Sequence, residues 1–391
     1  MKKPSSIAMP APKCPKVRAF TLIELMLSTA VLALLMALML TVVGQTQQIW
    51  VRSSGKVSQF QASRTAFEAM TRNLSQATLN TYYDLQFTGG STKGYSRNSD
   101  LHFVSGQAAQ AKFLGKDSDT YPTHAVFFQA PLGMTGETTG TGATEAKKYR
   151  TLSNLLTAAG YYVKWGKDQN LPPFITLPDR YRYRLMEVIQ PTESFGVNDT
   201  VRLPKANDWI QTALGLKSLP GSSDPNAPAG TKDSSRVLAE NVVALIILPK
   251  LSDKDTAAAT TFLAPNYEYD SRPADGAGKP KTWASLTKGT SEYNQFDQLP
   301  PVVRVTMVCI DEPSAVRQQS VSTSAPKWTS NLFTSATKED DVAKDLGDPE
   351  ALLPDTLIYR LAPPPGTLAT PKMNYRIYTM DVVIRGSKWS F

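Results

Sequence analysis

The sequence predicts an α+β protein in which one long amino-terminal helix precedes an antiparallel β-sheet body with long loop insertions. Three features of the 391-residue chain predict this fold class. An apolar run covers residues 20–43, apolar side chains then recur at helical spacing, and short runs of β-branched and aromatic residues alternate with polar stretches in the remainder. We therefore divide the chain into a leader (1–19), a transmembrane helix (20–43), an amphipathic continuation of that helix (44–80) and a β-rich body (81–391).

The leader carries positive charge and no acid. Its basic residues are Lys2, Lys3, Lys13, Lys16 and Arg18. Basic residues beside a membrane span stay on the cytoplasmic side, so we expect a cytoplasmic amino terminus and a body on the opposite side of the membrane. Because the leader holds more than half of the formal net charge of +8, the rest of the chain is close to neutral, and we expect no nucleic-acid partner.

The apolar run contains one ionisable residue, Glu24. A helix of this length measures roughly 36 Å, which is enough to cross the hydrocarbon core of a lipid bilayer. A charged side chain inside such a span costs about 3 kcal/mol, so Glu24 is a functional-site hypothesis. A cleavable secretory signal is disfavoured because its apolar region ends sooner. An ordinary membrane anchor accounts for the length of the run but not for the acid.

The helix is predicted to continue beyond the span as an amphipathic rod that ends near Leu79. One face of this rod carries Phe60, Phe67, Met70 and Leu74. We expect that face to pack on the protein's own sheet and also to make assembly contacts. Gly44 and Gly55 are candidate points of bending or local melting.

The body is predicted to contain strands separated by long polar connections. The predicted strands are Leu101–Ser105, His124–Ala130, Tyr161–Trp165, Tyr181–Ile189, Val242–Leu248, Val302–Ile310 and Tyr375–Ile384. The long connections are Gly133–Lys148, Leu203–Ser235 and Pro313–Pro354, and a helix is possible within Asp345–Leu361. Aromatic side chains in the strands, such as Tyr161, Trp165 and Tyr183, are expected to fill a core rather than form a binding surface.

The stretch Lys16-Val17-Arg18-Ala19-Phe20-Thr21-Leu22-Ile23-Glu24-Leu25 resembles the class III signal of type IV prepilins and pseudopilins. This resemblance implies that a prepilin peptidase cleaves between Ala19 and Phe20 and methylates the new amino terminus. It also implies that Glu24 pairs with the freed Phe20 amine of a neighbouring subunit and sets the axial register of assembly. The chain has Ala19 where the family usually has Gly. The implied location is the bacterial inner membrane with a periplasmic body, and the implied fold is pilin-like.

Two further resemblances lie in the body. The segment Leu299–Met307 resembles a late strand of the J-type minor pseudopilin of type II secretion. The segments Phe127–Gly133, Arg182–Glu187 and Asn374–Tyr378, together with Lys388-Trp389-Ser390, resemble the Verru_Chthon cassette protein C family. These resemblances imply export and assembly with other pilin-like or pseudopilin subunits on an inner-membrane assembly platform.

The sequence contains little that indicates catalysis or a cofactor. His102 and His124 are the two histidines, both in predicted strands, and Cys309 is the one cysteine outside the leader. Neither a zinc ligand pattern nor a nucleophile motif accompanies them. We expect packed histidines, a buried inert thiol, no cofactor and no metal.

The expected function is a non-catalytic minor pseudopilin-like subunit of a type II secretion or type IV pilus-like envelope structure. The large body favours a tip or priming position, because bulky heads crowd a packed filament. A surface pilus tip adhesin that binds polysaccharide, cells or DNA through its long loops is the first alternative. A membrane-tethered envelope enzyme that uses the helix only for delivery is the second.

Overall fold

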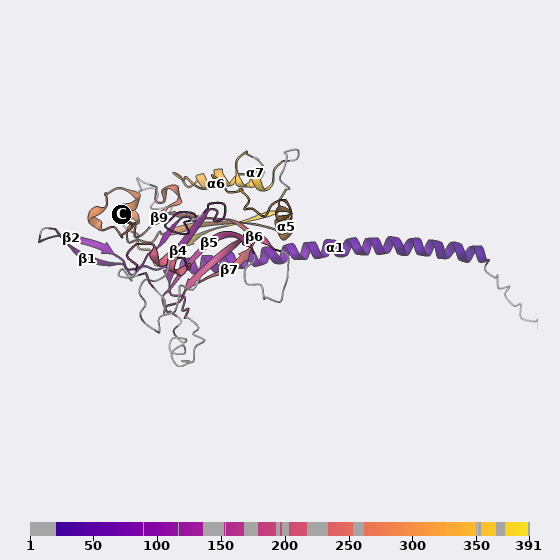
Figure 1. Cartoon of the computed structure of the whole chain (residues 1–391), viewed down its shortest axis with the longest axis horizontal. Helices are drawn as coiled ribbons and strands as arrows, with labels where there is room; N and C mark the ends of the chain where they lie inside the picture. Colours follow the sequence, from indigo (N-terminus) through magenta and orange to yellow (C-terminus); the bar gives the residue numbers. More distant parts are fainter. Residues whose placement is uncertain are drawn as a thin grey trace, which may run out of the picture. The chain divides into compact units, whose positions relative to one another are not determined.

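The structure is a computed structural model that describes residues 21–88, 90–115, 117–135, 152, 154–167, 179–192, 196–197, 203–216, 234–252, 262–348, 350, 353–364 and 372–389. The chain divides into two compact units, Met1–Val57 and Ser58–Phe391. Helix α1, Leu22–Ser75, runs through this division (Figure 1). It is the one helix among the described residues that is long and apolar enough to cross a membrane.

The amino-terminal part of helix α1 is apolar and exposed, whereas its carboxyl-terminal turns pack into the core of the second unit. Its large apolar side chains from Leu22 to Val57 are exposed, whereas Phe67, Met70 and Leu74 are buried. The predicted packing of the helical stripe on the protein's own sheet is thus confirmed. The helix is unbroken at Gly44 and Gly55, so the predicted local melting there is wrong. A single Gly costs about 1 kcal/mol in a helix interior, too little to interrupt so long an element.

The second unit is built on a six-stranded antiparallel sheet in the order β7-β6-β5-β4-β3-β9 (Figure 1). Its strands are β3 (Val104–Gln107), β4 (His124–Ala130), β5 (Thr157–Lys167), β6 (Tyr181–Gln190), β7 (Ser235–Glu240) and β9 (Tyr269–Asp270). A three-stranded antiparallel sheet has the order β11-β10-β8, from β8 (Val242–Lys250), β10 (Val302–Ile310) and β11 (Tyr375–Val383). The α+β class with antiparallel sheets is confirmed.

Two hydrophobic clusters lie on opposite faces of the six-stranded sheet, because alternate side chains of each strand point to opposite faces. On one face, Phe128 and Tyr161 join the buried residues of α1 and of strands β8 and β10. On the other face, Phe127 and Tyr162 join residues of α2 (Asp208–Ala213), including Ile210. The sheet is therefore covered on both sides, which explains why β4 is buried along its whole length.

Most predicted strands are confirmed, and the first is displaced. The predicted strand Leu101–Ser105 begins only at Val104, because side chains bind the backbone before it. The His102 N–H donates to Gln129 Oε1 at 2.7 Å, and the Phe103 N–H donates to Ser271 Oγ at 2.9 Å. A neighbouring strand cannot pair with an amide that a side chain already binds.

Several short elements lie outside the predicted set. The connections predicted as loops contain α2, α5 (Glu312–Val321) and α6 (Asp341–Leu346), while α7 (Leu357–Leu361) falls at the end of the possible helix. Strands β1 (Tyr82–Thr88) and β2 (Ser91–Asn98) form a separate hairpin. Helix α4 is Ser291–Gln295, and the short 3-10 segments are Pro265–Tyr267 and Trp283–Ser285. The predicted loop Gly133–Lys148 lies largely outside the described residues.

Candidate functional site

The first turn of α1 contains Glu24 in a reciprocal hydrogen-bonding arrangement with Thr21. The Thr21 N–H and Thr21 Oγ1–H each donate to Glu24 Oε2 at 3.3 Å, and the Glu24 N–H donates to Thr21 Oγ1 at 3.3 Å. This is the capping-box arrangement, which satisfies amides that have no partner within the helix. The carboxylate also lies at the positive end of the helix dipole. Glu24 therefore has a local role in its own chain, which the sequence analysis did not predict.

The other residues of the predicted processing site lie outside the described residues. They are Lys13, Lys16, Arg18, Ala19 and Phe20. The structure therefore bears only on Glu24, which it places in the first helical turn of an exposed apolar helix. The roles of these residues in cleavage, methylation and assembly remain predictions.

Neither histidine is available as a base in this structure, because each imidazole is buried and bonded at both nitrogens. His102 Nδ1 accepts from Trp209 Nε1–H at 3.1 Å, and His102 Nε2–H donates to Asp270 Oδ1 at 2.7 Å. His124 Nδ1 accepts from the Ile247 N–H at 3.0 Å, and His124 Nε2–H donates to the Phe333 carbonyl at 2.9 Å. Both side chains join separate segments of the body, as packed histidines do.

The buried thiol of Cys309 is likewise unsuited to chemistry. Burial raises the pKa of Cys309 to about 11, so the thiolate that would act as a nucleophile or metal ligand is scarce at neutral pH. Among the described residues, no group of three or more His, Cys, Asp or Glu side chains is arranged to hold a metal ion.

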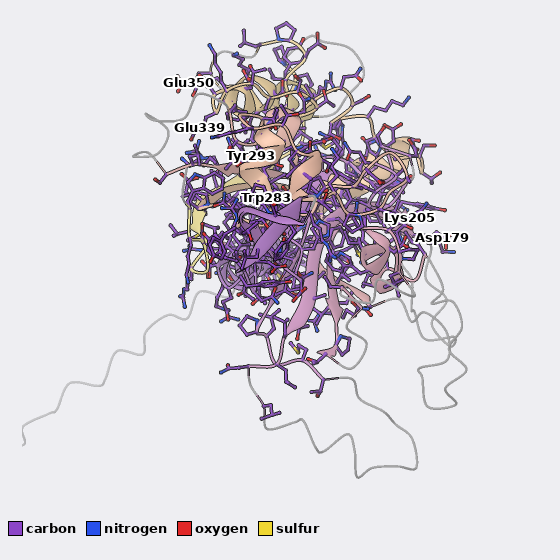
Figure 2. All side chains as sticks on the ribbon, turned by 90° about the vertical axis from the view of Figure 1, so that its left-hand side faces the viewer. Asp179, Lys205, Trp283, Tyr293, Glu339 and Glu350 are labelled. Atoms are coloured by element: carbon purple, nitrogen blue, oxygen red, sulfur yellow. The ribbon has the colours of Figure 1, made fainter. Side chains whose placement is uncertain are left out.

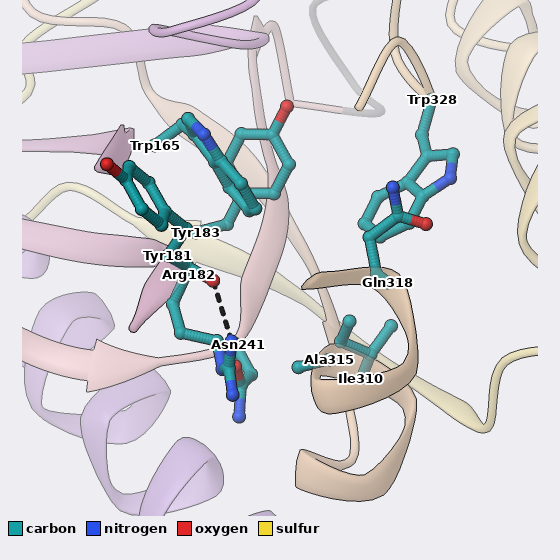
Figure 3. Close-up of a pocket in the computed structure, with 9 residues that line it drawn as sticks. All are labelled: Trp165, Tyr181, Arg182, Tyr183, Asn241, Ile310, Ala315, Gln318 and Trp328. Carbon is teal, nitrogen blue, oxygen red and sulfur yellow. Dashed lines mark hydrogen bonds between the residues drawn. The ribbon is translucent and has the colours of Figure 1, made fainter. Parts of the chain in front are cut away.

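The strand aromatics enclose a small internal cavity rather than a binding surface. Trp165 packs on Tyr183 with 4.7 Å between ring centroids, and Trp328 completes the aromatic wall (Figure 3). The Asn241 N–H donates to the Tyr183 carbonyl at 2.7 Å across this region. The cavity volume is about 10 Å³, close to the space of one water molecule. The prediction that these aromatics fill a core is confirmed.

Sequence reasoning missed two surface features of the body. The β1–β2 hairpin exposes Tyr83, Phe87 and Tyr95 by 68%, 65% and 75%. A cleft of about 390 Å³, lined by Glu268, Asp270 and Glu292 among others, lies beside β9 and α4. The exposed aromatics could have been noticed from the apolar alternation of residues 83, 85 and 87, whereas the cleft unites segments that are far apart in the chain.

Comparison with known proteins gives one match. Residues 14–40 match the model of the prokaryotic N-terminal methylation motif. No curated protein and no solved structure matches the chain. The matched segment covers the basic end of the leader, the residues around Ala19 and Phe20, Glu24 and most of the apolar run. The match supports a type IV pilin-like precursor that a peptidase processes and that assembles with other pilin-like subunits.

Proposed function

We propose that this pilin-like protein is a non-catalytic minor pseudopilin-like subunit, cleaved between Ala19 and Phe20 and anchored in the bacterial inner membrane with its body in the periplasm. The observation that carries the proposal is the methylation motif over residues 14–40, followed by an exposed apolar helix with Glu24 in its first turn. The basic leader supports a cytoplasmic amino terminus. Resemblances to Verru_Chthon cassette protein C and to the J-type minor pseudopilin favour the same class of subunit.

Glu24 has two roles in this proposal. Within one chain it caps the helix through Thr21. In the assembly it pairs with the amine of Phe20 in a neighbouring subunit, because an unpaired carboxylate in lipid is costly and a new amine is the nearest available cation. The size of the body favours a tip or priming position, where a bulky head does not crowd the packing of helices.

The first experiment is mass spectrometry of the amino terminus in membranes with and without the prepilin peptidase. We expect a mature chain that begins at methylated Phe20 when the peptidase is present, and an intact leader when it is absent. An intact leader in both membranes, or cleavage elsewhere, would contradict the proposal and leave a plain membrane anchor.

A matched pair of variants separates the two roles of Glu24. Glu24→Gln removes the charge but keeps a capping box, because Gln serves at this position as Glu does. Thr21→Ala removes the cap and keeps the charge. We expect Glu24→Gln to reduce incorporation into the assembled fraction by about tenfold or more, and Thr21→Ala to have little effect. If only Thr21→Ala reduced incorporation, Glu24 would act through the cap alone and the register role would be wrong.

A surface tip adhesin that binds polysaccharide is the second candidate, and the exposed hairpin favours it. The register of β1 and β2 places Leu85 opposite Tyr95, so these side chains share a face with Tyr83 and Phe87. Exposed aromatic rings of this kind can stack on sugar rings or on a protein partner. Labelling of intact cells by antibody against the body would favour the adhesin, since a periplasmic pseudopilin is shielded by the outer membrane.

A further inference from the structure

Eight of the eleven residues that line the cleft beside β9 have polar side chains. Its volume is about 390 Å³, within the range of small-molecule sites. The polar lining side chains are those of Lys112, Asn207, Asn266, Glu268, Asp270, Ser291, Glu292 and Gln295. Helix α4 supplies the last three, and Tyr293 of the same helix packs edge-on against Trp283 with 5.1 Å between ring centroids (Figure 2). Helix α4 therefore forms one wall of the cleft.

Asp270 is the most deeply held charged group of this cleft. Its side chain is 15% exposed and accepts from His102 Nε2–H at 2.7 Å and from the Arg272 N–H at 2.9 Å, both at Oδ1. Burial raises the pKa of Asp270, but His102, the charge of Lys112 and the Arg272 N–H outweigh burial and lower it. Asp270 is thus a carboxylate at neutral pH, and both of its hydrogen bonds from described residues are at Oδ1, which leaves Oδ2 for another donor.

The basic groups that act on Asp270 are His102 and Lys112. Trp209 Nε1–H donates to Nδ1 of His102, so the imidazole proton that faces Asp270 is the one on Nε2. Lys112 approaches Glu268 Oε2 at 3.7 Å, and Lys281 pairs with Glu292. The cleft therefore presents three carboxylates: Lys112 and Lys281 are directed to Glu268 and Glu292, and the His102 Nε2–H is directed to Asp270.

Asn207 adds one further acceptor to the lining of the cleft. Asn207 Oδ1 is a buried acceptor with no partner among the described residues. The carboxylates are not gathered into a group that could hold a metal ion within the described part of the chain. A ligand with several N–H donors distributed over its length fits these acceptors better than a single metal ion does.

We propose that this cleft binds a small organic cation through an ammonium or guanidinium group, with Asp270 as its principal charged acceptor. Two classes of ligand carry such a group: small alkyl amines or guanidines, and amino sugars. The inference is independent of the processing of the amino terminus, because the cleft lies wholly in the body.

The test is ligand-observed saturation-transfer NMR on the full-length protein in detergent micelles. The cationic probes are agmatine and glucosamine, and glucose and calcium chloride serve as controls. We expect saturable binding of at least one cationic probe, no saturable binding of glucose and no displacement by calcium. Tighter binding of agmatine would identify an alkyl amine or alkyl guanidine as the ligand class, and tighter binding of glucosamine would identify an amino sugar.

Three variants make the result specific. Asp270→Asn keeps an oxygen for the His102 and Arg272 donors but removes the charge, and we expect it to weaken binding about tenfold. Glu268→Gln, at a side chain that is 45% exposed, should weaken binding less without risk to folding. Asp179→Asn is the matched control, because Asp179 is an exposed acid that pairs with Lys167 outside the cleft (Figure 2).

Three outcomes would overturn the proposal. The first is the absence of saturable binding by either cationic probe. The second is equal weakening by Asp179→Asn and by both cleft variants, which would indicate attraction by the protein's overall charge. The third is binding of glucose, or competition by calcium, with the same dependence on Asp270.

Discussion

Burial shifts the pKa values of two side chains, His124 and Asp297, toward their neutral forms. Burial lowers the pKa of His124 to about 4, because a protonated imidazole would lose water and place a proton opposite the Ile247 N–H. Burial raises the pKa of Asp297 to about 7, against the opposing charges of Arg272 and Arg97. In both residues the neutral form is the one that the fold favours.

Asp297 is expected to make stability fall as pH rises. Its pKa in the folded protein is about 7 and its ordinary value is 3.8, so the unfolded chain loses the proton first. The free energy of unfolding therefore declines between about pH 4 and pH 7 and is constant above that range. Asp297→Asn removes this loss, and we expect it to stabilise the protein at pH 8 by on the order of 3 kcal/mol.

The backbone at Asp297 permits this replacement. The residue has φ of 51°, a left-handed conformation that Asn adopts as readily as Asp. Urea unfolding of both proteins at pH 4 and pH 8 checks the prediction. An equal difference between the two proteins at both pH values would show that Asp297 is not protonated in the fold.

Strand β5 contains two glycines with different surroundings. Gly160 lies opposite Phe127 in the register of β4 and β5, and a Cβ at Gly160 would lie 2.2 Å from Phe127 Cδ1. The Phe127 ring is stacked on Phe113 with 5.7 Å between centroids, so it has little freedom to move away. At Gly166, by contrast, a Cβ would have no neighbour within 4 Å.

Gly160→Ala is therefore expected to destabilise the fold by about 1–3 kcal/mol or more. Gly166→Ala in the same strand is the matched control and should change stability by no more than about 0.5 kcal/mol. Thermal unfolding followed by circular dichroism measures both. If the two variants were equally stable, the Phe127 ring would not lie over Gly160 as the structure places it.

The last turns of α1 form hydrogen bonds and core contacts with the body. Asn73 Nδ2–H donates to Tyr161 Oη at 2.9 Å, and Tyr161 Oη–H donates to Glu187 Oε1 at 2.9 Å. Arg236 Nε–H then donates to the same carboxyl group at 2.6 Å. This hydrogen-bonded chain links α1 through β5 and β6 to β7, and it leaves the buried Glu187 carboxylate with partners.

This arrangement predicts where the membrane part can be removed. A chain that begins at Ser58 keeps Phe67, Met70 and Leu74 and is expected to fold as a monomer with a cooperative thermal transition. A chain that begins at Gln76 loses these three buried side chains, each worth about 2–5 kcal/mol. That loss is comparable to the whole stability of a typical domain, so we expect aggregation. Size-exclusion chromatography and thermal melts compare the two, and equal stability would contradict the packing of α1 on the sheet.

The sequence was sufficient for the features that depend on neighbouring residues in the chain. The apolar run around Glu24 and the buried strands His124–Ala130 and Val302–Ile310 follow from local composition and periodicity, and the structure confirms the strands. Local turn and cap chemistry was predictable to a lesser degree. The Thr21 and Glu24 capping box follows a known sequence pattern, but the acid within an apolar run drew attention to assembly instead.

The features that remained hidden depend on residues that are distant in the chain. Asp270, which lines the cleft, and His102, which binds it from behind, are separated by 168 positions, and no periodicity within a segment relates them. The exposed face of the hairpin, with Tyr95 beside Leu85, follows a strand pattern that normally indicates burial. Periodicity predicts which side chains share a face of one helix or strand. Which other element packs against that face depends on the tertiary structure of the whole chain. For this protein the membrane helix is a property of the local sequence, and the cleft and the exposed hairpin are properties of the packed fold.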